Sequence, residues 1–249
     1  MKFLFTLLFA CFSITLSAQF DTGTSSTQAQ QLYQNALGQE KTGNLHQAKQ
    51  LLKQALHEDP SFIEAMNSLA EVFRNLEMID STIYYLKTSL KLYPRGLDAH
   101  QNLAAAFQIK GDYEAAINQY HELLDHYPNY PQAYYGMALI NYNRRQFPES
   151  IQGSEQAIRL FQISNSSVNA SDARMLAGQA YMKIGDYPTA IKYFKASKKH
   201  FEDKPFYHYY MGFCYLRSGK KEKAGHFLSQ AEVMGYKIPQ YVKTELEGL

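Results

Sequence analysis

The sequence predicts an all-α protein, an α-solenoid of about six stacked helix-turn-helix units. Three recurring intervals support this prediction, because a fixed period of about 20 to 50 residues is typical of repeat architectures. Proline, alanine and glycine each recur at intervals of 34 residues or of twice that number. The residues concerned are Pro60, Pro94 and Pro128, then the pairs Ala48 and Ala116, Ala190 and Ala224, Gly43 and Gly111, and Gly185 and Gly219.

Residues 1–18 have the order of a secretory signal peptide. Lys2 supplies a positive charge, the run from Phe3 to Leu16 is almost wholly apolar, and small residues follow up to Ala18. Because such segments are removed on export, we expect cleavage after Ala18 and a periplasmic or envelope-associated protein.

Two alternatives to cleavage stay open. The apolar run could remain as a membrane anchor, although a spanning helix needs about 20 apolar residues. Cys11 could instead be lipidated, and membrane association is expected only in these two cases. After cleavage Cys214 is the only cysteine left, so the fold would depend on packing without an intramolecular disulfide.

The array is expected to begin after a polar, Gly/Ser/Thr-rich leader at 19–28. Each unit should then be a helix, a turn and a second helix. In unit one Gly43 forms the turn, because a left-handed helix cap costs glycine little, and Pro60 ends the second helix. A small residue recurs once per unit where the two helices must approach closely. These residues are Ala36, Ala70, Ala104, Ala138, Gly178 and Gly212.

The pattern resembles the tetratricopeptide repeat (TPR) family, in which a small residue is followed by aromatic, Gly, Ala, aromatic, Ala and Pro positions. The motif is strongest in KGDYEAAINQY around Gly111, IGDYPTAIKYF around Gly185 and SGKKEKAGHFL around Gly219. The resemblance implies a right-handed superhelix over 29–249, with a C-terminal capping helix that shields the last unit. The expected units are 29–62, 63–96, 97–130, 131–164, 171–204 and 205–235, and the capping helix is expected at about 238–248.

Two units depart from the family pattern. Glu77 stands at the turn glycine of unit two and Arg145 at that of unit four, so we expect a looser turn in unit four. Six extra residues at 165–170 (NSSVNA) separate units four and five. Their polar character favours a longer loop over a local bend of the superhelix.

Charge and composition exclude some classes of function. The formal net charge is only +2, and the sequence contains no dense cluster of Lys and Arg, so nucleic-acid binding is not expected. The short basic runs Lys198-Lys199-His200 and Lys220-Lys221 are expected to be solvated helix ends.

No motif points to catalysis, a metal or a cofactor. The segment HELLDH at 121–126 places two histidines five residues apart, whereas a zinc protease needs a spacing of four to put both on one helical face. Walker, dinucleotide-binding, GxSxG and CxxC motifs are absent from the sequence. We therefore expect a protein that is not an enzyme and needs no cofactor.

In the TPR family the first helices line a concave groove that holds an extended peptide or a partner helix. The resemblance places a polar floor in the early units: Tyr33, Glu64, Asn67, Glu71, Arg74, Gln101 and Gln108. It places an apolar, aromatic floor in the later units: Tyr135, Tyr142, Met175, Met182, Phe206, Tyr209 and Phe213. For each of these residues, packing against an adjacent helix remains an alternative.

Some arrays of the family bind a C-terminal carboxylate through lysines in the groove. Here the matching positions hold Tyr33 and Gln101, so we expect a partner bound by aromatic contacts and side-chain amides. Such binding should hardly weaken with added salt.

The function expected from these features is a non-catalytic scaffold or adaptor of the bacterial envelope. Its partners would be other exported or envelope proteins that insert a peptide or helix into the groove. A polysaccharide- or peptidoglycan-binding module is the alternative, since tyrosine-rich grooves also stack on sugars. Self-association through the groove is possible as well.

Overall fold

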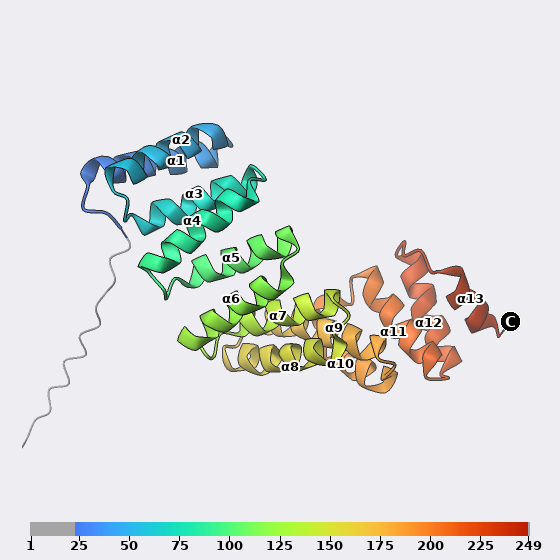
Figure 1. The fold of residues 1–249 in the computed structure, drawn as a ribbon. Helices are drawn as coiled ribbons and strands as arrows, with labels where there is room; N and C mark the ends of the chain where they lie inside the picture. The colour runs from blue at the N-terminus through green and yellow to red at the C-terminus, as the bar shows by residue number, and fades with distance from the viewer. Residues whose placement is uncertain (1–22, 249) are drawn as a thin grey trace, which may run out of the picture.

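The computed structural model describes residues 23–248, and that part of the chain consists of helices joined by short turns (Figure 1). Six antiparallel pairs are followed by one short helix, so the predicted units are present as helix pairs. The first three pairs are α1 (Thr27–Lys41) with α2 (Leu45–Glu58), α3 (Ile63–Asn75) with α4 (Ile79–Leu92), and α5 (Leu97–Lys110) with α6 (Tyr113–His126). The next three are α7 (Pro131–Asn143) with α8 (Phe147–Ile163), α9 (Ser167–Lys183) with α10 (Tyr187–Phe201), and α11 (Pro205–Arg217) with α12 (Lys221–Val233); α13 (Gln240–Glu247) ends the array.

The expected signal peptide at 1–18, with Cys11, lies outside the described residues and stays a prediction. The expected leader is shorter than its predicted range, because α1 begins at Thr27. The Ser26 hydroxyl accepts a hydrogen bond from the Ala29 amide, which fixes that helix start.

All six units share one turn between their two helices. In unit three the Gly111 amide donates to Gln108 O at 3.0 Å and the Asp112 amide to Phe107 O at 2.9 Å. The same two bonds form around Arg145 in unit four, whose φ of 62° is left-handed like that of the glycines. The looser turn expected in unit four is therefore wrong. The hydrogen bonds that close the helix end impose the conformation even on a residue that it strains.

The extra residues 165–170 do not form the longer loop that their polarity favoured. Instead α8 and α9 are each 17 residues long, and only three residues separate them. Asn165 adopts the left-handed conformation with φ 55°, and the Ser166 amide donates to Phe161 O at 2.8 Å. Ala170 and Ala173 are buried against α8, so packing overrides composition and the insertion extends two helices.

The recurring small residues lie where the helices of a pair touch. The four alanines among them, Ala36, Ala70, Ala104 and Ala138, are buried. A Cβ added at Gly178 would lie 2.5 Å from Cε1 of Phe194, which shows why only hydrogen fits at this crossing. The buried residues form four clusters along the array, and the partly buried Tyr85 and Tyr134 each pack against two of them.

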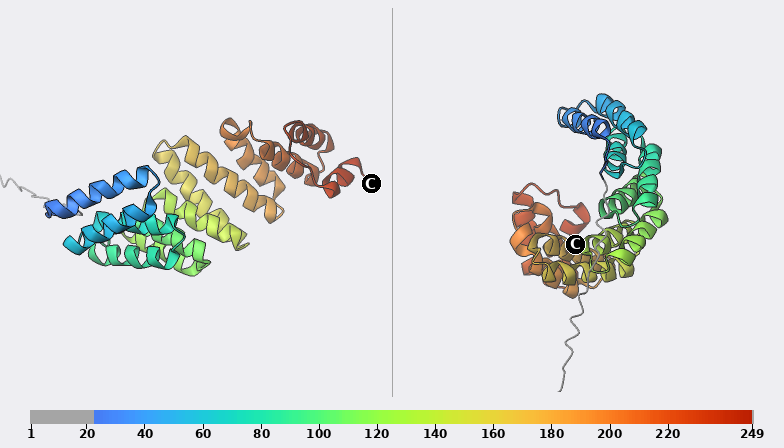
Figure 2. Two further views of the ribbon diagram at one scale, coloured as in Figure 1. Left: turned by 90° about the horizontal axis from the view of Figure 1, so that it is seen from above. Right: turned by 90° about the vertical axis from the view of Figure 1, so that its left-hand side faces the viewer.

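The stacked pairs follow a curve, which is clearest in the right-hand view of Figure 2. The first helices of neighbouring units share one face, called the inner face here, because side chains of α1, α3 and α5 line one common cavity. The second helices form the outer face, where side chains of α10 and α12 line another. The inner face carries the residues that the sequence singled out.

Candidate partner-binding groove

The inner face of units one to three forms a polar stretch. A cavity of about 360 Å³ lies between α1, α3 and α5. Five of the seven residues predicted for the polar floor line it, so the structure brings them together. The lining residues are Tyr33, Glu64, Asn67, Ser68, Glu71, Asp98, Gln101 and Asn102.

The polar stretch is acidic. Glu64, Glu71 and Asp98 all line the cavity, and Arg74 forms an ion pair of 3.4 Å with Glu71. Burial, together with the charge of Glu71, raises the pKa of the neighbouring Glu40. A ligand that brings positive charge or N–H donors would relieve this repulsion.

One amide in this stretch lacks a partner. The Asn67 side-chain oxygen is buried and accepts no hydrogen bond from the described part of the chain. A buried acceptor left unpaired costs roughly 1–3 kcal/mol. Gln101 and Gln108, in contrast, already hydrogen-bond the hydroxyls of Tyr130 and Tyr120. Asn67 is thus the amide of this stretch whose oxygen still lacks a donor.

In units four to six the first helices carry aromatic and apolar side chains in place of the polar ones. Tyr135 and Tyr142 on α7 are half-buried, as are Met182 on α9 and Phe213 on α11. Tyr142 meets Phe147 edge to face, with ring centroids 5.7 Å apart. Burial raises the pKa of both the Tyr135 and the Tyr142 hydroxyls. These rings are held in place by packing and still keep part of their surface open.

Two residues predicted for the aromatic floor belong to the core. Met175 is 4% exposed and Tyr209 is 9% exposed. Tyr209 stacks on Tyr236, with centroids 4.6 Å apart, and its hydroxyl is hydrogen-bonded to Tyr241 of α13. The capping segment therefore covers Tyr209, which has little surface left for a partner.

Tyr210 on α11 is a partly buried ring near Tyr142 that the sequence did not single out. It stacks on Phe194, with centroids 5.6 Å apart, and contacts Phe206 at 6.0 Å. Burial and the nearby hydroxyls of Tyr236 and Tyr142 raise its pKa to about 12. The four-residue spacing from Phe206 was a sequence signal that both rings share one helical face.

The histidines and the free cysteine of the described residues do not gather into a metal site. No group of three or more His, Cys, Asp or Glu among residues 23–248 is placed to hold a metal ion. His126 instead lies beside His100, with ring centroids 6.3 Å apart, and His100 is a buried residue bonded to Gln119 and to Pro94 O. Cys214 is free and buried, and burial raises its pKa to about 12. Within the same range no helix is long and apolar enough to cross a membrane.

Comparison with known proteins agrees with this architecture. Two family models, both described as tetratricopeptide repeat, match residues 102–167 and 171–199. A curated protein from Dictyostelium discoideum, DnaJ homolog subfamily C member 3 homolog, is 25% identical over 195 residues. The match covers 70% of this chain and 36% of that protein, so the chain spans about a third of the length of this relative.

Several solved structures have a similar fold. For pilF of Pseudomonas aeruginosa the TM-score is 0.68 at 18% identity, covering 88% of this chain and 97% of that one. A tetratricopeptide repeat protein from Parabacteroides merdae gives 0.66 at 17%, covering 89% and 98%. YrrB, described as a TPR protein with an unusual peptide-binding site, gives 0.64 at 16%, covering 80% and 98%. At such low identity these likenesses show the fold.

Proposed function

Because the chain is a tetratricopeptide repeat protein, we propose that it is a non-catalytic scaffold that holds a segment of another protein on its inner face. The observation that carries this proposal is the change of side chains along the first helices of the units. Units one to three offer carboxylates and amides, and units four to six offer partly open rings. A partner segment with donors at one end and apolar side chains at the other would match both stretches.

The aromatic stretch is expected to supply most of the binding energy. Tyr135 and Tyr142 come from the same helix and are already ordered by burial, so a partner loses little side-chain entropy when it contacts them. Rings of this kind often dominate an interface, each contributing about 1–2 kcal/mol or more. A partner that contacts Tyr142 would also reach Tyr210, because the two side chains are close enough for the Tyr142 hydroxyl to raise the pKa of Tyr210.

The polar stretch would set the orientation of the partner. Glu64, Glu71 and Asp98 favour a basic or N–H-rich end of the bound segment, and Asn67 would accept one hydrogen bond from it. Since these contacts add direction more than affinity, binding should depend only weakly on salt. A steep loss of affinity with salt would instead place the main anchor in the acidic stretch.

We further propose that the scaffold acts in the bacterial envelope, after export and cleavage between Ala18 and Gln19. The order of charge, apolar run and small residues in 1–18 supports this placement. Mass spectrometry of the protein isolated from envelope fractions would show a mature chain that starts at Gln19. Recovery of a chain that keeps residues 1–18, or that carries lipid at Cys11, would contradict this cleavage.

Site-specific photo-crosslinking tests the scaffold itself. A photoreactive amino acid would replace Asn67 or Tyr142 in the groove, or Tyr84 on α4 as a control that is 64% exposed. Crosslinking in native envelopes should give discrete partner bands from the two groove positions and none from Tyr84.

Loss of those bands in a Tyr135→Ala/Tyr142→Ala variant that melts like the parent would locate the anchors. Bands that are equally strong from Tyr84, or that survive in this variant, would exclude the inner face as the binding site. Bands that disappear after digestion of envelope glycans would favour the polysaccharide-binding alternative.

A further inference from the structure

A second groove lies on the outer face between α10 and α12. Two cavities of about 530 and 710 Å³ adjoin there and share Lys195 in their walls. The floor is the side of α11 that carries Tyr207, Met211 and Tyr215. At 100° per residue the centre of this side lies about 130° around α11 from the side that carries Tyr210 and Phe213, so the outer groove faces away from most of the inner face. The two sides meet at Phe213, whose ring contacts Tyr187 and Arg217 of the lining.

The walls of the outer groove are strongly basic. Glu202 is the only carboxylate in the lining of the two cavities, and it pairs with Lys198 at 3.3 Å. Within residues 23–248, Lys192, Lys195 and Lys220 form no ion pair. The cationic side chains of the lining are Lys192, Lys195, Lys198, Arg217, Lys220 and Lys223.

This charge is uneven along the molecule. Residues 171–235, which form units five and six, contain eleven Lys and Arg against six Asp and Glu. Residues 29–130, which form units one to three, contain eight against twelve. The small net charge of the whole chain therefore hides a basic C-terminal region. Of the lysine runs that the sequence placed at solvated helix ends, Lys198 lines one of the two cavities and Lys220 the other.

The junction between units five and six lacks an ion pair that closes earlier junctions. Lys110 binds Asp80 at 2.7 Å between units two and three, and Arg144 binds Glu114 at 2.6 Å between units three and four. In the 34-residue register the matching positions at the last junction are Ser218 and Pro188. Both of these residues line the outer groove, so its entrance lacks the ion pair that bridges units two and three and units three and four.

The corresponding groove between α6 and α8 provides an internal comparison. Its cavity of about 390 Å³ is lined by one acid, Glu149, one base, Arg159, and several amides. The geometry of stacked units thus also produces a groove between α6 and α8, and the basic lining distinguishes the groove between α10 and α12 from it.

We propose that the outer groove binds an extended acidic segment of a second protein. The 15 residues of α10 make the groove about 22 Å long, which fits six or seven residues of extended chain. Acidic side chains would reach the lysines on the walls, and alternate apolar side chains would face the aromatic floor. A flat bilayer would reach the lysines but not a floor recessed between two helices. The scaffold would then hold two proteins on opposite faces.

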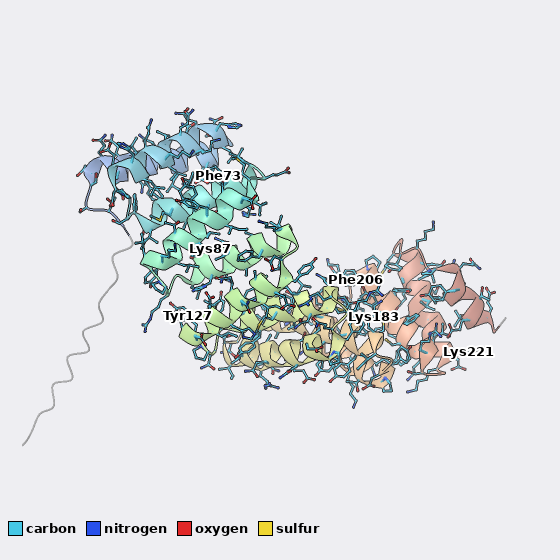
Figure 3. All side chains as sticks on the ribbon, viewed as in Figure 1. Phe73, Lys87, Tyr127, Lys183, Phe206 and Lys221 are labelled. Carbon is cyan, nitrogen blue, oxygen red and sulfur yellow. The ribbon has the colours of Figure 1, made fainter. Side chains whose placement is uncertain are left out.

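The test uses fluorescence anisotropy with the chain from Gln19 onward and a labelled eight-residue peptide of alternating Glu and Leu. We expect binding that weakens with salt, and at least a ten-fold loss in the Lys192→Glu/Lys195→Glu variant. Lys87→Glu/Lys91→Glu on α4 makes the same charge change on another second helix and should bind like the parent (Figure 3 labels Lys87). Tyr135→Ala/Tyr142→Ala should also bind like the parent, which separates failure here from failure of the inner-groove proposal.

Three results would overturn the proposal. The first is equal binding by the α10 variant and its α4 control, or by a peptide with Lys in place of Glu. The second is that vesicles of anionic phospholipid or a labelled oligothymidylate, but not the acidic peptide, bind in a manner that depends on Lys192 and Lys195. The third is sedimentation showing that the parent self-associates and that the α10 variant is monomeric, since a second copy of the chain would then occupy the groove.

Discussion

Gly178 illustrates how a single hydrogen atom sets a helix crossing. A glycine inside a helix normally costs about 0.5–1 kcal/mol relative to alanine. At Gly178 a methyl group would overlap the Phe194 ring, with separations of 2.5 and 2.7 Å, whereas at Gly38 on α1 nothing lies within 4 Å. The same substitution should therefore have opposite effects at the two positions.

We predict that Gly178→Ala lowers the free energy of unfolding by about 1–3 kcal/mol through overpacking. Gly38→Ala should raise it by about 0.5–1 kcal/mol, because it removes only the backbone freedom of the unfolded chain. Urea unfolding followed by circular dichroism measures both changes. A stabilised Gly178→Ala variant would mean that Phe194 can move aside and that the crossing is not tight.

Asp172 provides a prediction that depends on pH. Burial raises the pKa of its carboxyl, and nearby His200 opposes the shift. A carboxyl whose pKa is higher in the folded than in the unfolded state destabilises the fold once it is ionised in both states. This penalty is present above the folded pKa and disappears as the pH falls below the unfolded value.

Asp172→Asn should therefore raise Tm at pH 7 and leave it almost unchanged near pH 3. Asp203→Asn is the matched control, because a hydrogen bond from Lys204 lowers the pKa of Asp203, so its replacement should not raise Tm at pH 7. Thermal melts at the two pH values test the pair. A rise of Tm in Asp172→Asn that is larger at pH 3 than at pH 7 would contradict this pH dependence.

At the scale of elements, the turn inside each unit tolerates strain at two positions. Glu77 and Arg145 adopt the left-handed conformation with φ of 59° and 62°, which costs a residue with a side chain about 1–2 kcal/mol. Replacing Arg145 by glycine relieves this strain but adds freedom to the unfolded chain. We expect Arg145→Gly to raise the free energy of unfolding by about 0.5–1 kcal/mol, and Gly111→Ala to lower it by a similar amount. Chemical denaturation measures both changes. If the free energy of unfolding shifted in the same direction in the two variants, the result would contradict a turn shared by all units.

The junction of units four and five depends on one carboxylate. Glu155 on α8 accepts hydrogen bonds from the hydroxyl of Tyr181 on α9 at 2.9 Å and from that of Tyr193 on α10 at 2.6 Å. The two rings stack with centroids 5.4 Å apart. The three helices are thereby held at one point.

Glu155→Gln should lower the free energy of unfolding by about 1 kcal/mol, because a neutral amide is a weaker acceptor than a carboxylate. Glu149→Gln on the same helix removes an exposed carboxylate and should stay within about 0.5 kcal/mol of the parent. Equal losses in guanidinium unfolding would show that the change of charge, and not the hydrogen bonds, is responsible.

The elements also show which local features a single sequence can predict. The 34-residue period was sufficient for the number of units and for their turns, since Gly43 and Pro60 act through local backbone geometry. The segment 165–170 was predicted wrongly because its composition favours a loop. What decides its conformation is burial of Ala170 against the neighbouring helix, which no local pattern reveals.

For the whole molecule, the sequence predicts which residues share a helical face but not which contacts form between units. The register predicted that Tyr33, Asn67 and Gln101 lie together, because each stands on the same face of a first helix. It failed at Tyr209, whose exposure depends on Tyr236 and α13 folding back over it. The basic outer groove was missed for the same reason, since its lysines come from two helices that meet only after stacking.

The capping helix provides a prediction about cooperativity along the array. Val242 of α13 is buried, as is Ile238 just before it, and Tyr236 covers Tyr209. In a repeat protein each unit contacts only its neighbours, so loss of the cap should weaken the last unit first. We predict that a chain ending at Gly235 loses hydrogen-exchange protection in α11 and α12 while α1 to α4 keep theirs.

Val242→Asp in the full chain should reproduce this graded loss without a change of length, and Gln240→Asp, at an exposed position on the same helix, should not. Because the inner anchors Tyr135 and Tyr142 lie on α7, two units away, partner crosslinking through Tyr142 should survive the truncation. A uniform fall of protection along all units would mean that the array unfolds as one body. The cap would then be needed for the inner groove as well as for the last unit.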